Sequence, residues 1–218
     1  MSRREEITVT CPKCGTEHPF VIWSSINTTL NPDMKAAVKD LSAFQFECPS
    51  CGEKTYVDYG CLYHQMEDRI MIQYANSDKS AEQCYEMMTR DGPTGILQDM
   101  RKNGYLLRIV RSQRELLEKI AVFDAGLDDR IIEICKVFIL AAFHEGNPDC
   151  GEIETLYFRD DDKNLVQIIA DGEAKGVAEI PDAFYEELCQ EYDGKIPDMR
   201  KDDPCIDRYR ALQMMGLR

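Results

Sequence analysis

Short apolar segments separated by polar turn residues make up the first third of the chain. β-Branched and aromatic residues dominate these segments, a composition typical of strands. The segment that begins at Asn31 and Pro32 differs, because this pair is typical of a helix start. The sequence therefore predicts one short helix among five strands, at residues 6–9, 19–23, 43–47, 54–59 and 69–75.

Helical patterns begin after the polar segment 76–80. A capping box at Ser80 and Gln83 predicts a helix that ends near Gly92. A strand at 104–110 could pair with the strand at 69–75. Further helices are predicted at 112–126, 128–144, 181–192 and 203–215, with a β-hairpin at 152–171 and a strand at 176–180. The wide apolar stripe of the helix at 128–144 predicts that it is buried on most sides. This mixture of elements predicts an α+β protein.

The chain carries a strong acidic excess. Its 218 residues include 26 Lys and Arg against 40 Asp and Glu, which gives a net charge of −14. Such a charge repels phosphate backbones, so nucleic acid is not the expected partner. The longest apolar run, Val137–Phe143, has seven residues, which is too few to cross a bilayer. With no apolar run behind the first arginines either, we expect a cytoplasmic protein that does not enter a membrane.

Ten cysteines fall into two groups. Four lie in two nearly identical turns, CPKCG at residues 11–15 and CPSCG at residues 48–52, and the other six are scattered singly. In a reducing compartment, paired and scattered cysteines together are typical of metal binding and not of a disulfide framework.

Each cysteine turn can place two thiolates on one ion. Four thiolates at the corners of a tetrahedron suit Zn²⁺ at bond lengths of about 2.3 Å, and they leave no position for a substrate. The long gap between the turns costs little, since doubling a closed loop adds only ~0.6 kcal/mol. Structural zinc contributes about 10–16 kcal/mol at neutral pH. We therefore predict one structural Zn²⁺ on Cys11, Cys14, Cys48 and Cys51.

Three other uses of these cysteines stay open. An iron centre of the rubredoxin type has the same ligand geometry. A redox pair needs an exposed cysteine at a helix N-terminus, whereas glycine and strand-like sequence follow each pair here. Disulfides within the turns would not persist in a reducing compartment.

The two turns, the connecting segment WSSINTTLNPDMKAAV and the later LYHQM resemble the CpXC domain. This bacterial family is named for its paired Cys-Pro-x-Cys motifs. The resemblance covers residues 6–110, and residues 107–136 look like a segment that often follows the domain. It implies zinc on the same four cysteines, and it implies no activity.

The resemblance and the predicted elements together suggest two domains. Residues 1–76 are expected to form a zinc-ribbon-like β domain with a short inserted helix, whose sheet the strand at 104–110 could complete. Residues 77–218 are expected to form an α+β domain with a buried central helix at 128–144 and a β-hairpin at 152–171.

No phosphate-binding glycine loop, nucleophile elbow or metalloprotease spacing occurs in the sequence. A closed four-thiolate site without a catalytic constellation predicts a zinc-binding structural or adaptor protein that binds a protein partner and performs no catalysis.

Two alternatives rest on other residues. In an enzyme, Cys61, His64 and Glu67 could share one helix face and form a second metal site or a catalytic pair, although a buried, hydrogen-bonded histidine is the simpler interpretation. In a nucleic-acid-binding protein, the basic segment 101–114 could contact phosphates and Trp23 could stack on bases, although a solvated strand and helix start explain the segment as well. His18 could donate a hydrogen bond to the metal site or lie on the surface.

Overall fold

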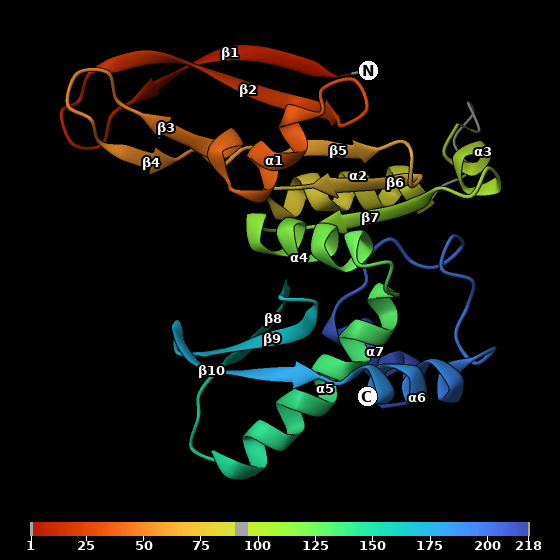
Figure 1. Cartoon of the computed structure of the whole chain (residues 1–218). Coiled ribbons are helices and arrows are strands. Elements are labelled where there is room, and N and C mark those ends of the chain that lie inside the picture. The colour runs from red at the N-terminus through yellow and green to blue at the C-terminus, as the bar shows by residue number, and fades with distance from the viewer. Residues whose placement is uncertain (1, 90–95, 218) are drawn as a thin grey trace. The chain divides into compact units, whose positions relative to one another are not determined.

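The computed structural model describes residues 2–89 and 96–217. It contains two compact units, Met1–Gln113 and Arg114–Arg218 (Figure 1). Each unit combines helices with a sheet, which confirms the predicted α+β class. The predicted helix end near Gly92 lies outside the described residues.

The first unit is built on a five-stranded mixed sheet in the order β1-β2-β5-β6-β7. Neighbouring strands are antiparallel in β1·β2 and β5·β6, and parallel in β2·β5 and β6·β7. Long strands β1 and β2 form a hairpin that extends beyond the rest of the sheet (Figure 1). The five strands are β1 (Arg3–Thr10), β2 (Glu17–Asn27), β5 (Cys61–Gln65), β6 (Ile70–Tyr74) and β7 (Leu106–Val110).

A second, two-stranded sheet lies between β2 and β5 in the chain. The predicted helix after Asn31 is α1 (Asp33–Lys39), and a 3-10 turn η1 (Ser42–Phe44) leads from it into the small sheet. Its strands, β3 (Gln45–Glu47) and β4 (Lys54–Tyr56), are antiparallel and are joined by the second cysteine turn. This arrangement gives each cysteine turn its own hairpin.

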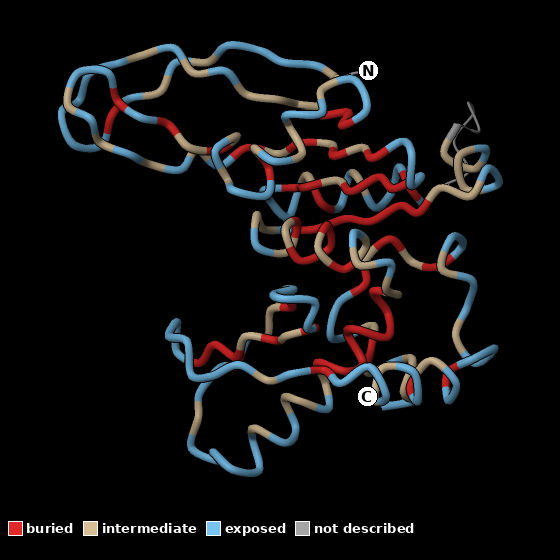
Figure 2. Tube along the Cα trace, viewed as in Figure 1, coloured by how far each residue is buried: buried red, intermediate tan, exposed pale blue. Residues whose placement is uncertain are grey.

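The strand expected at 104–110 is β7, whose five residues pair with β6 in parallel. A parallel pair needs a crossover connection, here α2 (Asp78–Thr89) and α3 (Ile96–Lys102). All five residues of β7 are buried although β7 is an edge strand of this sheet, and Figure 2 shows the strand in red. The compact unit therefore ends at Gln113 and not at the boundary expected at residue 76, because the last strand of its sheet comes after that boundary.

The second unit packs helices on a three-stranded antiparallel sheet of order β10-β9-β8. Its strands are β8 (Ile153–Asp160), β9 (Lys163–Ala170) and β10 (Glu173–Ile180). Its helices are α4 (Gln113–Asp124), whose first residue ends the first unit, α5 (Asp129–Gly146), α6 (Asp182–Tyr192) and α7 (Arg208–Met214). Asp128 caps α5 by accepting a hydrogen bond from the backbone amide of Arg130 at 2.9 Å.

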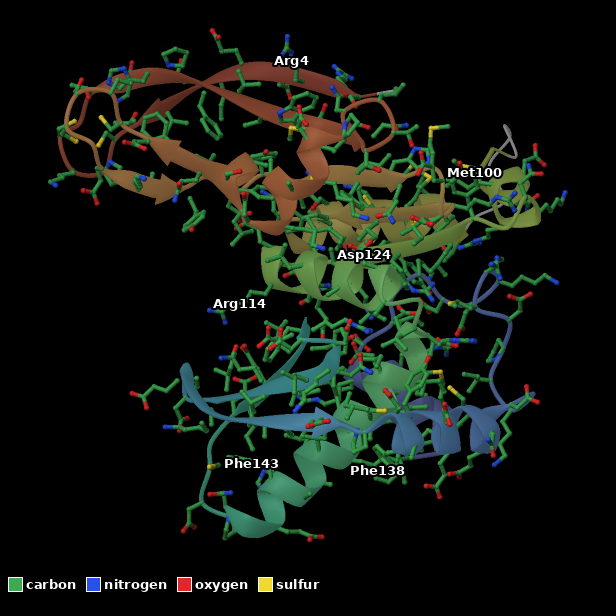
Figure 3. The ribbon with its side chains drawn as sticks, in the orientation of Figure 1. Arg4, Met100, Arg114, Asp124, Phe138 and Phe143 are labelled. Atoms are coloured by element: carbon green, nitrogen blue, oxygen red, sulfur yellow. The ribbon has the colours of Figure 1, made fainter. Side chains whose placement is uncertain are left out.

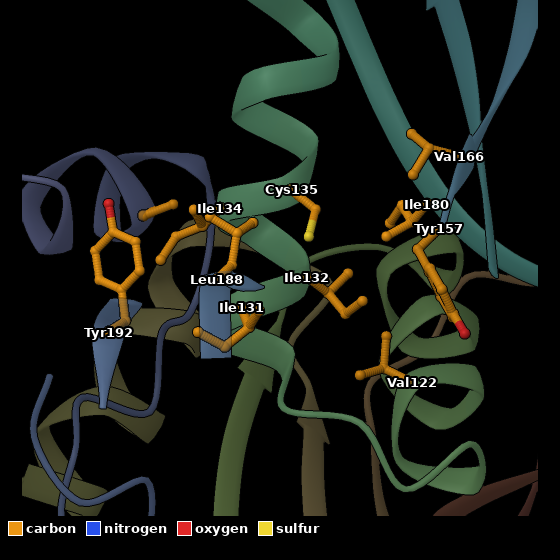
Figure 4. Packing of buried hydrophobic residues seen from close by; sticks show 11 residues of the cluster. Val122, Ile131, Ile132, Ile134, Cys135, Tyr157, Val166, Ile180, Leu188 and Tyr192 are labelled. Atoms are coloured by element: carbon orange, nitrogen blue, oxygen red, sulfur yellow. The ribbon is translucent and has the colours of Figure 1, made fainter. Parts of the chain in front are cut away.

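Helix α5 is buried in its first half only. Eight consecutive residues, Asp129–Lys136, are buried on all sides of the helix, whereas the residues after them are half-buried or exposed. Apolar side chains of α5 pack with Val122, Tyr157, Val166 and Leu188 (Figure 4). The predicted burial of the helix at 128–144 is therefore correct for its first two turns and wrong for the rest. The buried half also contains four charged residues that the apolar stripe did not predict: Asp129, Arg130, Glu133 and Lys136.

Candidate metal centre

The two cysteine turns have the same backbone structure. The amide of Gly15 donates to the carbonyl of Cys11 at 3.0 Å, and the amide of Gly52 donates to the carbonyl of Cys48 at 2.9 Å. Both glycines adopt φ +71°, a left-handed conformation that favours glycine. The sequence repeat is therefore a structural repeat, with one turn between β1 and β2 and the other between β3 and β4.

The four sulfur atoms of the turns lie within 4.8 Å of one another. Across the two turns, the sulfur atoms of Cys11 and Cys51 are 3.6 Å apart, and those of Cys14 and Cys48 are 3.7 Å apart. Four ligands about 2.3 Å from a tetrahedral ion are separated by about 3.8 Å. Disulfide sulfurs would lie only about 2.05 Å apart. The group is positioned to bind a metal ion, and Figure 3 shows sulfur atoms where the two turns meet.

Apolar packing holds the turns together on one side of the cluster. Cys11 and Cys48 are buried with Phe46, and the rings of Phe20 and Phe46 meet edge to face at 5.9 Å. Cys14 is exposed on the other side. The cluster therefore has a dry side and a side open to solvent.

The four thiols differ in acidity. Hydrogen bonding by Thr16, foremost through its hydroxyl, lowers the pKa of Cys14. Burial raises the pKa of Cys48, but hydrogen bonds from the Ser50 amide and the Thr16 hydroxyl outweigh burial and lower this pKa to about 6. The pKa of Cys51 is raised to about 12, because burial and the neighbouring thiols outweigh a hydrogen bond from the Glu53 amide. Four closely spaced thiols do not all ionise readily, because neighbouring thiolates repel one another. A bound cation offsets this repulsion.

Two hydroxyl residues next to the cysteines were missed as part of this site. The Oγ1 atom of Thr16 lies 2.9 Å from the sulfur of Cys14, and Ser50 contacts the Nε2 atom of His18 at 3.0 Å. Their only signal in the sequence is a position within two residues of a cysteine. His18 itself, expected either beside the cluster or on the surface, is half-buried at the edge of the cluster.

The structure does not bring Cys61, His64 and Glu67 together. Their segment is strand β5 and not a helix, so Cys61 and His64 point to opposite faces, and Glu67 lies in the exposed turn that follows. Burial raises the pKa of Cys61 to about 12. The Nε2 atom of His64 lies 3.3 Å from the hydroxyl of Tyr105, which supports a hydrogen-bonded, structural histidine.

The basic segment 101–114 does not form a continuous cationic surface. Arg108 is only 1% exposed. Arg111 pairs with Asp78 at 2.8 Å, and Lys102 pairs with Asp99 at 3.8 Å. In the second unit, Arg114 lies 3.8 Å from Glu154.

The face of Trp23, considered for base stacking, already has a cation beside it. The guanidinium carbon of Arg4 lies 5.9 Å from the centre of the indole ring. This cation–π contact accounts for the position of Trp23 without a bound base.

Two further features concern the cysteines and the helices of the chain. All ten cysteines lie among the described residues and none forms a disulfide. No helix within residues 2–89 and 96–217 combines the length and the apolar character that crossing a bilayer requires.

Comparison with known proteins agrees with the cysteine cluster. A family model described as CpXC protein matches residues 9–136, more than half of the chain. The matched region contains both cysteine turns and continues through residues 107–136, the segment that resembled the extension of the domain. No curated protein and no solved structure matches the chain.

Proposed function

Because this chain belongs to the CpXC protein family, we propose that it is a zinc-binding structural protein whose ion clamps two hairpin tips of its first unit. One observation carries the proposal: four thiols from two equivalent turns lie at distances that suit a single tetrahedral ion. Zinc would supply a strong cross-link between β-hairpins that are otherwise joined by a small apolar cluster and a few polar contacts, such as His18 with Ser50 and Lys13 with Glu53.

A structural role follows from the number of ligands. Four cysteines complete a tetrahedral zinc site and leave no open position at which water or substrate could bind. The other candidate catalytic residues, Cys61 and His64, point to opposite faces of β5. We therefore propose that the metal stabilises the hairpins and takes no part in a reaction.

The clamped hairpins offer a surface for a protein partner. Strand β1 is the edge of its sheet and is mostly exposed. Val21 on β2 and Tyr56 on β4 are apolar side chains with 42% and 56% exposure. We propose that a partner protein in a reducing, cytoplasmic compartment binds these hairpins, a setting that ten unpaired thiols favour.

Metal analysis and unfolding test the structural part of this proposal. The full chain, purified without added metal under reducing conditions, should contain about one zinc per chain. Chelation should destabilise the first unit. An iron site of the rubredoxin type would instead be coloured and would contain iron. Equal stability with and without metal would refute the clamp.

The proposed binding of a partner protein needs a separate experiment. A Val21→Asp, Tyr56→Asp double variant changes only exposed side chains and should keep its zinc. It should lose any partner that the wild-type chain retains from an extract of its own host. A partner that binds both chains equally would contradict the assignment of this surface.

A further inference from the structure

The hydroxyl of Thr16 contacts sulfur atoms of both cysteine turns. Its Oγ1 atom is 2.9 Å from the sulfur of Cys14 and 3.7 Å from the sulfur of Cys48. Thr16 follows the first turn directly, immediately before β2. A residue of the first hairpin thus reaches the cysteine of the second hairpin as well as its own.

His18 extends this contact to the second turn. Its Nε2 atom lies 3.2 Å from the hydroxyl of Thr16 and 3.0 Å from the hydroxyl of Ser50. The ring also lies beside Phe46 of the apolar cluster, with ring centres 6.4 Å apart. His18 therefore joins a hydroxyl of one turn to a hydroxyl of the other.

We propose that Thr16 and His18 are positioning residues of the metal site, which hold the exposed Cys14 sulfur in its ligating position and reduce its negative charge. This inference rests on the proposed metal site and assigns a role to residues that are not ligands. In this proposal the neutral His18 ring carries its proton on Nε2, which lies within hydrogen-bond distance of the two hydroxyl oxygens. The Thr16 oxygen accepts it, which leaves the hydroxyl proton of Thr16 for the Cys14 thiolate.

Cys14 is the ligand that most needs such a partner. Four thiolates around a divalent ion leave two excess negative charges, and hydrogen bonds to the sulfurs distribute that charge. Cys11 and Cys48 are buried with apolar side chains, whereas Cys14 is exposed to water that could compete for the metal. Loss of partners around metal ligands commonly weakens metal binding about 10–100-fold.

The experiment uses the full chain loaded with Co²⁺, which reports both affinity and electron density at sulfur. Thr16→Val keeps the shape of the side chain and removes the hydroxyl, Thr16→Ser keeps the hydroxyl, and Thr8→Val makes the same change on exposed β1. We expect Thr16→Val to bind Co²⁺ and Zn²⁺ at least about 10-fold more weakly. Its sulfur-to-cobalt charge-transfer band should also move to lower energy, because the thiolate becomes more electron-rich. Thr16→Ser and Thr8→Val should behave as wild type.

His18→Ala tests the role of the His18 ring, which lies between the hydroxyls of Thr16 and Ser50. It should move the charge-transfer band in the same direction as Thr16→Val, and by less, because the Thr16 hydroxyl remains. The band is measured on metal-bound protein, so a change of stability alone does not move it.

The outcomes separate this inference from the proposed function. If the wild-type chain binds one metal ion and Thr16→Val matches it in affinity and spectrum, the role of Thr16 is refuted and the metal site stands. Equal shifts in Thr8→Val and Thr16→Val would refute it too. If the wild-type chain binds no metal, the proposed function itself fails.

Discussion

The sulfur atoms of Cys14 and Cys48 lie 3.7 Å apart, although the two residues are separated by 34 positions in the chain. This relationship joins two hairpins that share no sheet, since β1 and β2 belong to the large sheet and β3 and β4 form a sheet of their own. A metal ion bound by these sulfurs would therefore link the tip of the β3–β4 hairpin to the tip of the β1–β2 hairpin.

Replacing Cys48 should detach the hairpins. Cys48→Ser removes a buried ligand, so we expect metal content to fall to below about one tenth of an ion per chain, because three thiolates and a hydroxyl make a poor zinc site. Amide hydrogen exchange should rise in residues 9–20 and 44–57, the strands and turns around the cluster, and should not change in the second unit. Mass spectrometry measures both the bound metal and the exchange.

The matched control is Cys205→Ser, which removes a thiol from the second unit. This variant should keep its metal and its exchange pattern. Full metal content in Cys48→Ser would contradict the ligand assignment, since no other described cysteine lies with the cluster.

Thiol reactivity should separate Cys14 from Cys61. The thiolate is the nucleophile, and burial raises the pKa of Cys61 to about 12. At pH 8 Cys61 is therefore almost entirely in the unreactive thiol form. In metal-free, folded protein at this pH, iodoacetamide should modify Cys14 first, because Cys14 is exposed and Thr16 lowers its pKa, whereas Cys48, whose pKa is also lowered, is buried.

Peptide mapping at increasing reaction times tests this order. Cys61 should react only after urea is added, and so should Cys135, whose pKa burial raises to about 12. Modification of Cys61 at the rate of Cys14 in folded protein would show that β5 opens far more readily than its burial indicates.

The four-cysteine cluster was predictable because its signal is local. Two cysteines, a proline and a glycine within five residues determine a turn, and the same turn occurs twice. Sulfur is also a specific ligand type, so the pairing of Cys11 and Cys14 with Cys48 and Cys51 needed no knowledge of the intervening chain.

Features that depend on tertiary contacts were not predictable in the same way. Strand β5 has no turn residue between Cys61 and Gln65, and a spacing of three allowed a helix as easily as a strand. Thr16 and Ser50 become part of the site only when the turns meet. The charged residues of α4 and α5 follow the pattern of solvent-exposed helix faces. The sequence does not indicate which of them form ion pairs in the core.

Lys136 and Glu118 show what such burial requires. The Nζ atom of Lys136 lies 2.8 Å from Oε1 of Glu118 and 3.0 Å from Oε1 of Glu133, with less than a tenth of each side chain exposed. Lys119 pairs with Asp129 at 3.1 Å and with Glu133 at 3.3 Å. Three carboxylates thus share two ammonium groups, in a network that ties α4 to α5.

Removing one cation from this network should be costly. Lys136→Met leaves Glu118 and Glu133 buried with one ammonium group fewer, and we expect a loss of about 3–5 kcal/mol in the free energy of unfolding. Urea titration followed by circular dichroism measures this loss. Lys163→Met, which removes an exposed lysine 3.7 Å from Glu179, should change stability by less than about 0.5 kcal/mol. A loss of stability in Lys136→Met as small as that in Lys163→Met would contradict the prediction that the buried carboxylates need Lys136.

Glu118→Gln should behave differently from Lys136→Met, and its effect should depend on pH. Burial, foremost, raises the pKa of Glu118 above its ordinary value of 4.5, so the folded protein retains a proton that the unfolded chain releases above that pH. Its contribution to stability is complete below pH 4.5 and is lost as pH rises through the raised pKa.

Glutamine keeps an oxygen that can accept the hydrogen bond from the Tyr157 amide, which Glu118 accepts at 2.7 Å, and it carries no charge at any pH. Wild type should therefore lose stability relative to Glu118→Gln as pH rises above 4.5. The pKa of Glu133 is lowered in spite of burial, because Lys136 and Lys119 attract its charge, so its contribution is lost only below pH 4.5. Urea titrations of both proteins at four pH values give the difference, in which contributions from the rest of the chain cancel. A difference that stays constant, or that favours wild type as pH rises, would mean that Glu118 is ionised in the folded protein throughout this range.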